Sequence, residues 1–477
     1  MLMEPLAMGL RTGLLSLLVV LAAGGTASAD DAPRPNILFL LADDQAYDTI
    51  AELGNREIET PNLDRLVQRG VTFTHAYNQG GWVGAVCVAS RTMLNTGLSL
   101  WRARAAENDL NQWVQQRRLW PQRLAAQGYD TYFTGKWHVK ANPRQVFQVV
   151  RNVRGGMPNQ TPQGYNRPLP DQPDAWKPWD TQFGGFWQGG KHWSEVVADD
   201  AIDYLAMARG SENPFFMYIA FNAPHDPRQS PREYVEKYPL EKISLPQPYV
   251  PQYPYDIGSN HIRDETLAPF PRTEHAVKVH RQEYYAIITH MDAQIGRILK
   301  ALEDSGQAEN TYIVFTADHG LACGHHGLMG KQNMYDHSMR VPFMVVGPGI
   351  TAGQRIDAPI YLQDVVPTTL EWAGAAVPED VEFQSLVPLL RGETGNWRKA
   401  AYGAYIDFQR MVMRDGFKLI GYPKLDKILL FDLRNDPLET RDLSNDPRYA
   451  FQLSQLQGEL RRLAAELDDP LFKEAQP

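Results

Sequence analysis

The sequence of 477 residues contains only two cysteines, Cys87 and Cys323. Two cysteines cannot form the disulfide framework that stabilises small secreted domains, so the fold must depend on a buried core. With 43% apolar residues, the chain can form two domains or one large domain with a smaller one attached. No run of Lys and Arg occurs, and the net charge is −9. An acidic surface repels phosphate backbones, so we expect no nucleic-acid partner.

Long apolar runs are also missing: no stretch approaches the roughly 18 apolar residues that a membrane-spanning helix needs. Near the N-terminus, Arg11 precedes a shorter apolar run at 14–23, and the small residues at 27–29 form a cleavage site before Asp30. This order is typical of a secretory signal. We predict that residues 1–29 are a signal peptide and that the mature protein is secreted or periplasmic. No lipoprotein cysteine lies beside the cleavage site, so we expect no membrane association after cleavage; an uncleaved N-terminal anchor is the alternative.

Strand-like and helix-like segments alternate along the chain, which predicts an α/β fold with a mainly parallel sheet flanked by helices. The continuous apolar run Asn36 to Ala42 suits a strand buried on both faces. A helix is predicted from Pro61 to Gly70, with Thr60 as its cap. Because ligands bind beyond the carboxyl ends of strands in such sheets, motifs that follow separate strands should meet at one edge. Further strands are predicted at 130–134, 215–221, 312–316 and 342–346.

Two segments interrupt this alternation. Residues 141–188 are rich in Pro, Gly, Asn, Gln and Trp, and residues 229–272 in Pro and Tyr. Long loops in compact domains are functional or disordered, and the aromatic residues favour ordered insertions at the rim of a site. Such aromatic side chains suit sugar rings, although ordinary packing explains them equally well. Residues 30–375 then form the large domain. Residues 376–477 form a smaller C-terminal α+β domain, with strands at 417–421 and 427–431 and a helix at 448–467.

Acidic residues follow two of the predicted strands: Asp43 and Asp44 come after the first, and Asp318 and His319 after the strand at 312–316. Adjacent carboxylates repel each other unless a cation lies between them. Oxygen ligands favour Ca²⁺ or Mg²⁺ over Zn²⁺. We therefore predict a metal site of Asp43, Asp44 and Asp318, to which His319 adds a nitrogen ligand or a neighbouring proton donor. Taken alone, the Asp43-Asp44 pair is more simply a helix cap or a turn.

Lysines and histidines follow other strands. Lys136 and His138 lie two apart in an extended segment, so their side chains project to the same side and can reach one anion. His225 lies between two prolines that fix a turn, and Lys331 lies in a Gly- and His-rich loop beyond Asp318. Each signal is weak alone. Together they predict a positively charged pocket for an anionic substrate.

One segment carries a specific resemblance. Cys87-Val88-Ala89-Ser90-Arg91, continued to Thr96-Gly97, resembles the activation signature of type I sulfatases, which belong to the alkaline phosphatase-like superfamily. The family pattern is Cys-x-(Pro or Ala)-x-Arg followed by a helix ending in Thr-Gly, and Ala89 stands where Pro is commoner. Over about residues 35–345, the other motifs follow in the family's order. The resemblance implies an alkaline-phosphatase-like large domain, one bound calcium ion rather than magnesium, and a formylglycine made from Cys87 by a formylglycine-generating enzyme.

The resemblance also implies a role for each residue. The hydrated formylglycine at Cys87, a gem-diol, would be the nucleophile. His138 would take a proton in the elimination that releases sulfate, and His225, aided by Lys331, would protonate the leaving oxygen. The sulfate oxygens would be neutralised by the calcium ion, Arg91, Lys136 and Lys331. The ligands of the ion would be Asp43, Asp44, Asp318, His319 and the residue at 87.

These implications predict an exported sulfatase that hydrolyses a sulfate monoester on a sulfated saccharide and releases inorganic sulfate. Choline sulfate or an aryl sulfate is the alternative substrate. A phosphate or phosphonate ester hydrolase of the same superfamily usually has a Ser or Thr nucleophile and two zinc ions, and the Cys87 signature with a single oxygen-rich site disfavours it. A non-catalytic carbohydrate-binding protein would not need every catalytic residue type.

Overall fold

The apolar run Asn36–Ala42 forms strand β1, which is buried along its whole length. In this computed structural model, β1 lies between two parallel neighbours, β9 (Phe215–Ala220) and β10 (Thr311–Ala317). Strands β5 (Asp130–Lys136) and β6 (Val149–Arg154) continue the parallel arrangement beyond β9. The eight strands follow the order β13-β2-β12-β10-β1-β9-β5-β6. The predicted α/β fold with a mainly parallel sheet is therefore confirmed.

The structure describes residues 1–2, 34–156, 158, 161–258 and 262–473. Apart from residues 1 and 2, the predicted signal segment 1–29 lies outside the described residues. Within those residues, no helix combines the length and the apolar character needed to cross a membrane. Residues 34–477 form one unit by their internal contacts.

The strand predicted at 342–346 exists, but its direction differs from that of its neighbours. β12 (Phe343–Val346) pairs antiparallel with β10. The chain returns from β10 through a loop and the short helix α10 (Asp336–Met339), without the crossover that a parallel strand needs. The carboxyl end of β12 therefore lies at the edge remote from the end of β10. Beyond β12, the sheet is completed by β2 (Val71–Phe73), antiparallel to it, and β13 (Gln354–Ile356), parallel to β2.

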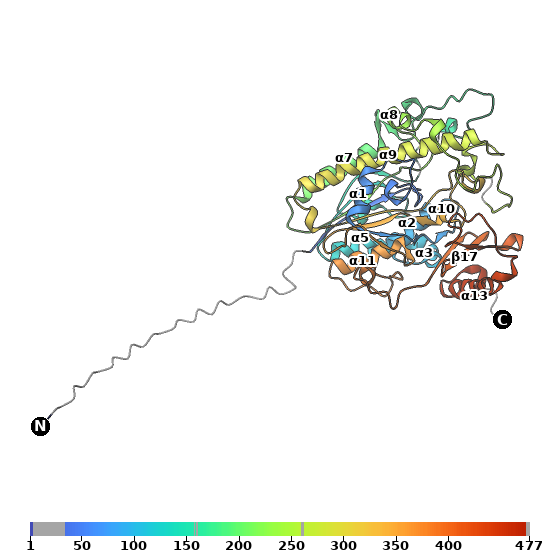
Figure 1. Ribbon diagram of the computed structural model, residues 1–477. Helices are drawn as coiled ribbons and strands as arrows, with labels where there is room; N and C mark the ends of the chain where they lie inside the picture. The colour runs from blue at the N-terminus through green and yellow to red at the C-terminus, as the bar shows by residue number, and fades with distance from the viewer. Residues whose placement is uncertain (3–33, 157, 159–160, 259–261, 474–477) are drawn as a thin grey trace. The chain divides into compact units, whose positions relative to one another are not determined.

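Helices cover both faces of the sheet (Figure 1). One face carries α1 (Pro61–Arg69), α7 (Trp193–Ala208) and the long α9 (Glu274–Asp304). The other carries α2 (Val86–Thr96), α3 (Leu100–Ala106), α5 (Trp120–Ala126) and α11 (Val365–Trp372). The predicted helix after Thr60 is confirmed as α1, with Leu63, Leu66 and Val67 buried. Helix α9 was not predicted, because buried polar residues such as His280 and Glu283 interrupt its apolar pattern.

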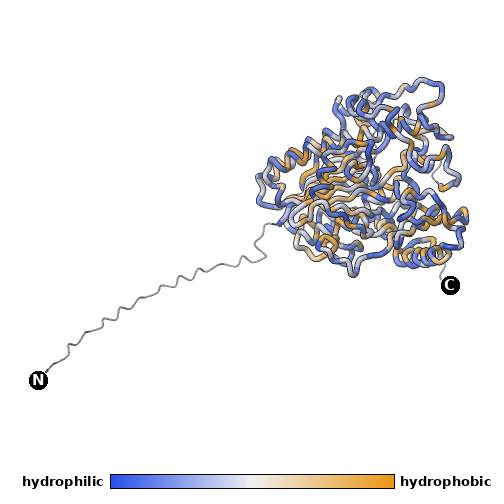
Figure 2. Tube along the Cα trace, in the orientation of Figure 1, coloured by the Kyte–Doolittle hydropathy of each residue, from blue (hydrophilic) through white to orange (hydrophobic). Residues whose placement is uncertain are grey.

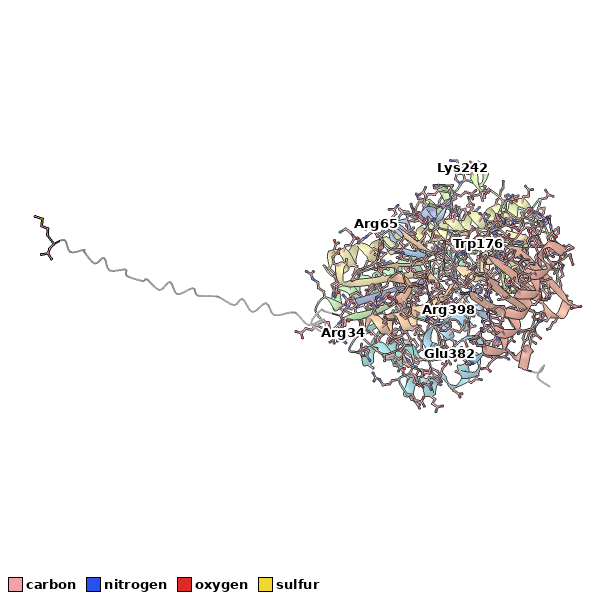
Figure 3. The ribbon with its side chains drawn as sticks, turned by 60° about the horizontal axis from the view of Figure 1, so that its bottom comes forward. Arg34, Arg65, Trp176, Lys242, Glu382 and Arg398 are labelled. Atoms are coloured by element: carbon pink, nitrogen blue, oxygen red, sulfur yellow. The ribbon has the colours of Figure 1, made fainter. Side chains whose placement is uncertain are left out.

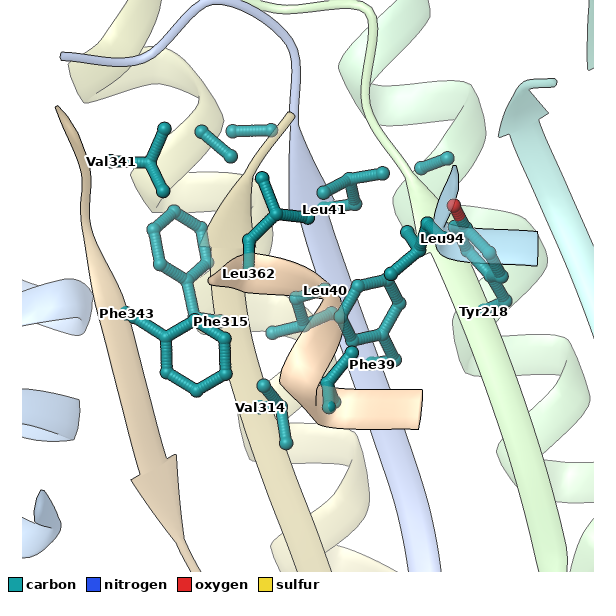
Figure 4. Packing of buried hydrophobic residues seen from close by; sticks show 14 of the residues in the cluster. Phe39, Leu40, Leu41, Leu94, Tyr218, Val314, Phe315, Val341, Phe343 and Leu362 are labelled. Atoms are coloured by element: carbon teal, nitrogen blue, oxygen red, sulfur yellow. The ribbon is translucent and has the colours of Figure 1, made fainter. Parts of the chain in front are cut away.

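Apolar residues fill the space between the sheet and the helices. Figure 2 shows them concentrated along the interior strands, and Figure 4 shows side chains of neighbouring strands packed together. The Phe39 ring lies edge-on against Tyr218 and Trp120, with ring centroids 4.9 and 5.1 Å apart. Burial of each such side chain contributes about 1.5–3 kcal/mol, so this core fixes the strand ends without disulfides. Cys87 and Cys323 are both free thiols, as expected.

The C-terminal residues form a second, antiparallel sheet packed against α13 (Ala450–Glu466). Its strands β17 (Phe417–Tyr422) and β18 (Lys427–Asp432), like α13, lie where the sequence predicts them. β15 (Ala400–Tyr405) and β16 (Gln409–Arg414) complete the hairpin series. The fifth strand of this sheet is β4 (Gly80–Gly81), which comes from the large domain and pairs parallel with β15. A Cβ atom at Gly80 would lie 2.0 Å from the Ala404 carbonyl oxygen, so this close pairing requires glycine.

The segment 141–188 differs in part from the predicted rim insertion. Its first residues form α6 (Pro143–Val146) and the edge strand β6 of the main sheet. The Trp176 side chain, labelled in Figure 3, is 3% exposed and stacks on Phe183 at 5.1 Å, so packing accounts for this aromatic residue.

The remaining short elements of the chain are η2 (Ala51–Leu53), β3 (Ala76–Tyr77), η3 (Glu107–Asp109), α4 (Leu110–Gln115), η4 (Pro162–Gly164), η5 (Thr181–Phe183), β7 (Trp187–Gln188), β8 (Lys191–His192), α8 (Arg232–Glu236), η6 (Leu240–Lys242), η7 (Arg263–Leu267), η8 (Ala308–Asn310), η9 (His325–Gly327), β11 (Arg340–Val341), β14 (Ile360–Tyr361), η10 (Leu362–Asp364), α12 (Val387–Leu390), η11 (Pro423–Leu425), η12 (Pro447–Tyr449) and α14 (Pro470–Lys473).

His192 caps helix α7 as a neutral imidazole. Its Nδ1 accepts a hydrogen bond from the Ser194 amide at 3.1 Å, and its Nε2 lies 2.8 Å from the Gln229 carbonyl oxygen, to which it donates. Burial, with a smaller effect of His290, holds the pKa of His192 well below its usual value. Protonation would abolish the bond from Ser194. At pH values below the pKa of His192 in the unfolded chain, the unfolded state is protonated at this residue and the folded state is not.

We expect the stability difference between the wild type and a His192→Asn variant to depend on pH. The folded pKa is depressed, so the stability that His192 provides is present above the unfolded pKa of about 6.5 and is lost as pH falls below it, by up to about 1.4 kcal/mol per pH unit. Asn can still cap α7 but does not titrate. Urea unfolding at pH 8, 7, 6 and 5 measures the difference, with a substitution of the exposed His275 by Asn as the control. A difference that stays constant with pH would contradict this account.

Candidate active site

Four parallel strands bring the predicted site residues to one edge of the main sheet. Asp43 and Asp44 follow β1, Lys136 ends β5, and Asp318 follows β10. Backbone hydrogen bonds hold the loops together there: the Asp43 amide donates to the Ala223 carbonyl at 3.0 Å, and the Asp318 amide to that of Ala42 at 3.1 Å. The loop after β9 that carries His225 therefore joins the same edge, and the predicted convergence is confirmed for these four strands.

The potential ligand atoms of Asp43, Asp44, Cys87 and His225 all lie within 4.8 Å of one another, and all four residues are buried. Three of these four were predicted as metal ligands, whereas His225 was predicted only as an acid. Asp318 lies beside the group, where its Oδ1 accepts a hydrogen bond from the Asp44 amide at 3.3 Å. The His319 Nδ1 lies 3.2 Å from the Gly320 carbonyl oxygen. The four converging side chains are thus the group best placed to hold an ion.

Two lysines neutralise the paired carboxylates. The Lys136 Nζ lies 2.5 Å from Asp43 Oδ2, and the Lys331 Nζ lies 2.5 Å from Asp44 Oδ2. The Lys331 Nζ also lies 3.1 Å from the Cys87 Sγ. Each lysine is almost completely buried, so these charge pairs act in a low dielectric. The positive charge that the sequence predicts for an anion is therefore concentrated directly around the Cys87 side chain.

Arg91 connects helix α2 to the ends of the strands. Its Nε donates to Asp318 Oδ2 at 2.7 Å, and its Nη1 donates to the Lys136 carbonyl at 2.5 Å. Its Nη2 lies 3.8 Å from Asp43 Oδ1 and has no hydrogen-bond partner among the described residues. Arg91 is fully buried and one helical turn beyond Cys87. It therefore fixes the Asp318 carboxylate, and its buried Nη2 remains without a hydrogen-bond partner among the described residues.

Cys87 is the second residue of α2, whose N-terminus favours negative charge. The Sγ lies 3.4 Å from Asp43 Oδ1 and 3.6 Å from Asp44 Oδ1. Burial, together with Asp318 and Asp44, raises the pKa of the Cys87 thiol well above its usual value. The unmodified thiol therefore remains protonated and is a poor nucleophile, since the reactive form of cysteine is the thiolate.

Burial disfavours the ionised form of the Asp43 and Asp44 carboxylates, even though each is paired with a lysine. Burial and the neighbouring carboxylates raise the pKa of Asp44 to about 8, although Lys331 opposes the shift. Burial also raises the pKa of Asp43. At Asp318 the cations outweigh burial, and Arg91 above all lowers its pKa below the usual range. A hard cation with oxygen ligands would stabilise the ionised forms of Asp43 and Asp44, so the residues present fit such an ion.

The two predicted catalytic histidines differ in their surroundings. Burial, followed by Lys136, lowers the pKa of His138 to about 3, so its imidazole is neutral; its Nδ1 has no partner among the described residues. Burial and Lys331 hold the pKa of His225 well below its usual value. The His225 Nδ1 donates to the Asp226 carbonyl at 2.8 Å, which leaves Nε2 unprotonated and 3.5 Å from Asp44 Oδ2. His138 can accept a proton, and His225 becomes a donor only after it is protonated.

A cavity of about 340 Å³ opens onto these residues. The segment 229–272 contributes to its wall through Ile262, Arg263 and Asp264, which agrees with its predicted place at the rim. Arg263 and Asp264 were missed in the sequence, because isolated polar residues in an insertion carry no periodic signal; Ile262 and Gln332 belonged to no motif. A larger hollow of about 660 Å³, next to Arg102 and Arg398, includes none of the predicted site residues. The cavity is lined by Gly84, Ala85, Cys87, His138, His225, Ile262, Arg263, Asp264, Lys331 and Gln332.

Comparison with known families accounts for this arrangement. A family model described as Sulfatase matches residues 35–375, which is more than half of the chain. The chain belongs to the sulfatase family. A second model, described as the C-terminal part of N-sulphoglucosamine sulphohydrolase, matches residues 324–466 of this sulfatase. It is therefore a hydrolase of sulfuric esters, as predicted. The second model supports a C-terminal domain, but it begins at residue 324 and so does not test the predicted boundary at residue 376.

Relatives cover almost the whole sulfatase chain. An arylsulfatase of Clostridium perfringens is 29% identical over 455 residues, which include 89% of this chain and 93% of that protein. A solved structure described as a complex with its substrate D-glucosamine-2-N,6-O-disulfate superposes with a TM-score of 0.72 at 23% identity and covers 93% of this chain and all of that one. A phosphonate monoester hydrolase from Silicibacter pomeroyi also has a TM-score of 0.72, at 22% identity, with 91% of this chain and 95% of that one covered. These likenesses show a shared fold, and the family model identifies the sulfatase.

Proposed function

We propose that this protein is an exported sulfatase that hydrolyses the sulfate ester of a sulfated saccharide through a formylglycine made from Cys87, with the aid of a bound calcium ion. The observation that carries the proposal is the position of the Cys87 Sγ, which lies between the Asp43 and Asp44 carboxylates and the Lys331 ammonium. A relative solved with a sulfated glucosamine supports the saccharide. The signal-like residues 1–29 support export.

The proposed reaction depends on two hydroxyl groups at one carbon. Oxidation of the Cys87 thiol to an aldehyde by a formylglycine-generating enzyme, followed by hydration, supplies both. One hydroxyl attacks the sulfur, and the bond between the sulfur and the saccharide oxygen breaks as that oxygen gains a proton. The second hydroxyl then loses its proton, the aldehyde re-forms, and the bond from carbon to the sulfate oxygen breaks. Inorganic sulfate leaves, and hydration restores the nucleophile.

The residues of the chain divide this work. Lys331, which lines the cavity, would pair with sulfate oxygens, and the buried Lys136, paired with Asp43, would add positive charge that stabilises the transition state. The neutral His138 is suited to accept the proton of the second hydroxyl. Lys331 carries a proton close to the leaving oxygen, and an anionic substrate would favour protonation of His225 for the same purpose. A calcium ion held by Asp43 and Asp44 of the converging group, with Asp318 beside them, would supply further positive charge toward the sulfate.

Mass spectrometry of the tryptic fragment 70–91, from protein produced with a formylglycine-generating enzyme, tests the proposal directly. We expect a loss of about 18 Da at Cys87, as a thiol becomes an aldehyde. The fragment that contains Cys323 should keep its mass and is the control within the same sample. Released sulfate, measured with sulfated sugars, should rise in proportion to the converted fraction. An unmodified Cys87 in a preparation that still turns over sulfate esters would refute the formylglycine mechanism.

A further inference from the structure

Part of the active-site wall is a rigid turn from the second insertion. In η7, the Glu265 carboxylate accepts hydrogen bonds from the Met329 and Gly330 amides at 2.9 and 2.8 Å, and from the Arg272 Nη2 at 2.6 Å. The next residue after these amides is Lys331. The turn is therefore fastened to the loop that carries Lys331, and the side chains that it presents to the cavity have fixed positions relative to the sulfate site.

Arg263 and Asp264 are the charged residues that this turn presents to the cavity. Asp264 is 4% exposed, and its carboxylate accepts from the Arg263 Nη2 at 2.5 Å and from the Gln332 Nε2 at 2.8 Å. Arg263 Nε also lies 3.5 Å from Asp226 Oδ2, and that oxygen accepts from the Tyr165 hydroxyl at 2.7 Å. The guanidinium is thus already balanced by two carboxylates. It has little net positive charge to offer a second anionic group.

Hydrogen-bonding capacity nevertheless remains on this wall. The Arg263 side chain is 29% exposed and lines the cavity, and within the described part of the chain its hydrogen bonds come from Nη2 alone, so other N–H groups of the guanidinium can donate. The ionised Asp264 has further lone pairs to offer, because a carboxylate accepts about four hydrogen bonds. One donor and one acceptor side by side match a hydroxyl group, which both donates and accepts. Charged partners make such bonds stronger than those between neutral groups.

The rest of the cavity argues against other kinds of substrate. Among the described residues that line it, none is Phe, Tyr or Trp. A quaternary ammonium group is typically held by an aromatic cage, and an aryl ring by stacking, and the described residues of this wall offer no Phe, Tyr or Trp for either. The volume of about 340 Å³ lies at the lower end of the range for ligand pockets, which suits a single ring.

We propose that Arg263 and Asp264 bind hydroxyl groups of the sugar that carries the sulfate. The preferred substrate is then a terminal sulfated sugar with a free hydroxyl near the sulfate, and with neither a carboxylate nor a second sulfate at that position. This inference rests on the proposed function, which places the sulfate ester beside Cys87.

The test compares substrates and variants together. For a panel of sulfated monosaccharides and their deoxy analogues, we expect the wild type to lose roughly 10–100-fold in kcat/KM when the recognised hydroxyl is removed. In Asp264→Asn, which keeps the shape of the side chain but loses its charge, this ratio should fall toward one. Asp256→Asn, at an exposed position in the same insertion, is the matched control and should retain the wild-type ratio. A purely structural defect would lower both rates and leave their ratio unchanged.

Calorimetric binding of the same sugars to a Cys87→Ala protein separates this inference from the proposed function. Discrimination in binding without any sulfate release by the converted wild type would refute the function and support the inference. Sulfate release with equal rates for each sugar and its deoxy analogue would overturn the inference and leave the function standing. Faster turnover of sugars with a carboxylate or a second sulfate at the recognised position would also overturn it.

Discussion

Replacement of Cys87 by Ser or Ala is expected to lower steady-state sulfate release by at least about 10⁴-fold, because neither residue can become the proposed formylglycine. The two variants should differ in one respect. Serine has a single hydroxyl, which can attack sulfur once but cannot expel the sulfate by re-forming an aldehyde. The Cys87→Ser protein should therefore retain a sulfate ester after incubation with substrate, whereas Cys87→Ala should not.

Intact mass spectrometry after incubation measures this difference as a gain of about 80 Da on the Ser variant alone. Cys323→Ala is the control, because its thiol lies in a separate buried cluster with Leu321 and Tyr284 and should not affect turnover. Circular dichroism should show an unchanged fold in both Cys87 variants, since Ser and Ala are smaller than Cys. Steady turnover by Cys87→Ala would exclude any covalent role for this position.

Arg91→Met is expected to have the largest effect on stability. The wild-type guanidinium bonds to Asp318 and to the Lys136 carbonyl in a fully buried place. Its removal leaves buried negative charge without compensation, and breaking such a pair costs about 3–5 kcal/mol. The loss of free energy of unfolding should be larger in the presence of a chelator than with added calcium, because an ion at the adjacent carboxylates would replace part of the missing charge.

Denaturant unfolding of Arg91→Met and Arg91→Lys, with chelator and with calcium, checks this result. Lysine keeps the charge but cannot reach both Asp318 and the Lys136 carbonyl with a planar fork, so its loss should be intermediate. Arg65, whose partner Glu303 lies at the surface, is the matched control: Arg65→Met should cost no more than about 1 kcal/mol. Equal stability of wild type and Arg91→Met would show that burial of Asp318 needs no cation.

The parts of the fold that the sequence predicts are those with an unambiguous pattern. β1 is a continuous apolar run between polar residues, and the helix after Thr60 has an apolar face. The direction of β12 could not be predicted, because an apolar run of four residues reads the same in parallel and antiparallel sheets. The sequence did not predict helix α9 for a different reason. Its buried face includes His280, Glu283 and other polar residues, which acquire hydrogen-bond partners only in the folded protein.

The residues of the candidate site also divide into those that the sequence predicts and those that it does not. Asp43, Lys136 and Asp318 could be grouped from the sequence, because each stands at the end of an apolar strand and such ends meet at one edge of a parallel sheet. Arg263 and Asp264 could not, since they reach the cavity only through the path of a long insertion. The orientation of His225, with Nδ1 bonded to the Asp226 carbonyl, likewise depends on a turn whose geometry the sequence does not specify.

The pairing of β4 with β15 has a consequence for the order of events during synthesis. Cys87 is 1% exposed in the folded protein, so a modifying enzyme can reach it only before the surrounding structure closes. The strand β4, six residues before Cys87, gains its partner only when residues 400–405 have left the ribosome. More than 300 residues must therefore be translated between the appearance of the cysteine and the completion of the sheet beside it. At about 5–20 residues per second, this takes at least roughly 15–60 s, during which the proposed oxidation of the thiol would compete with folding.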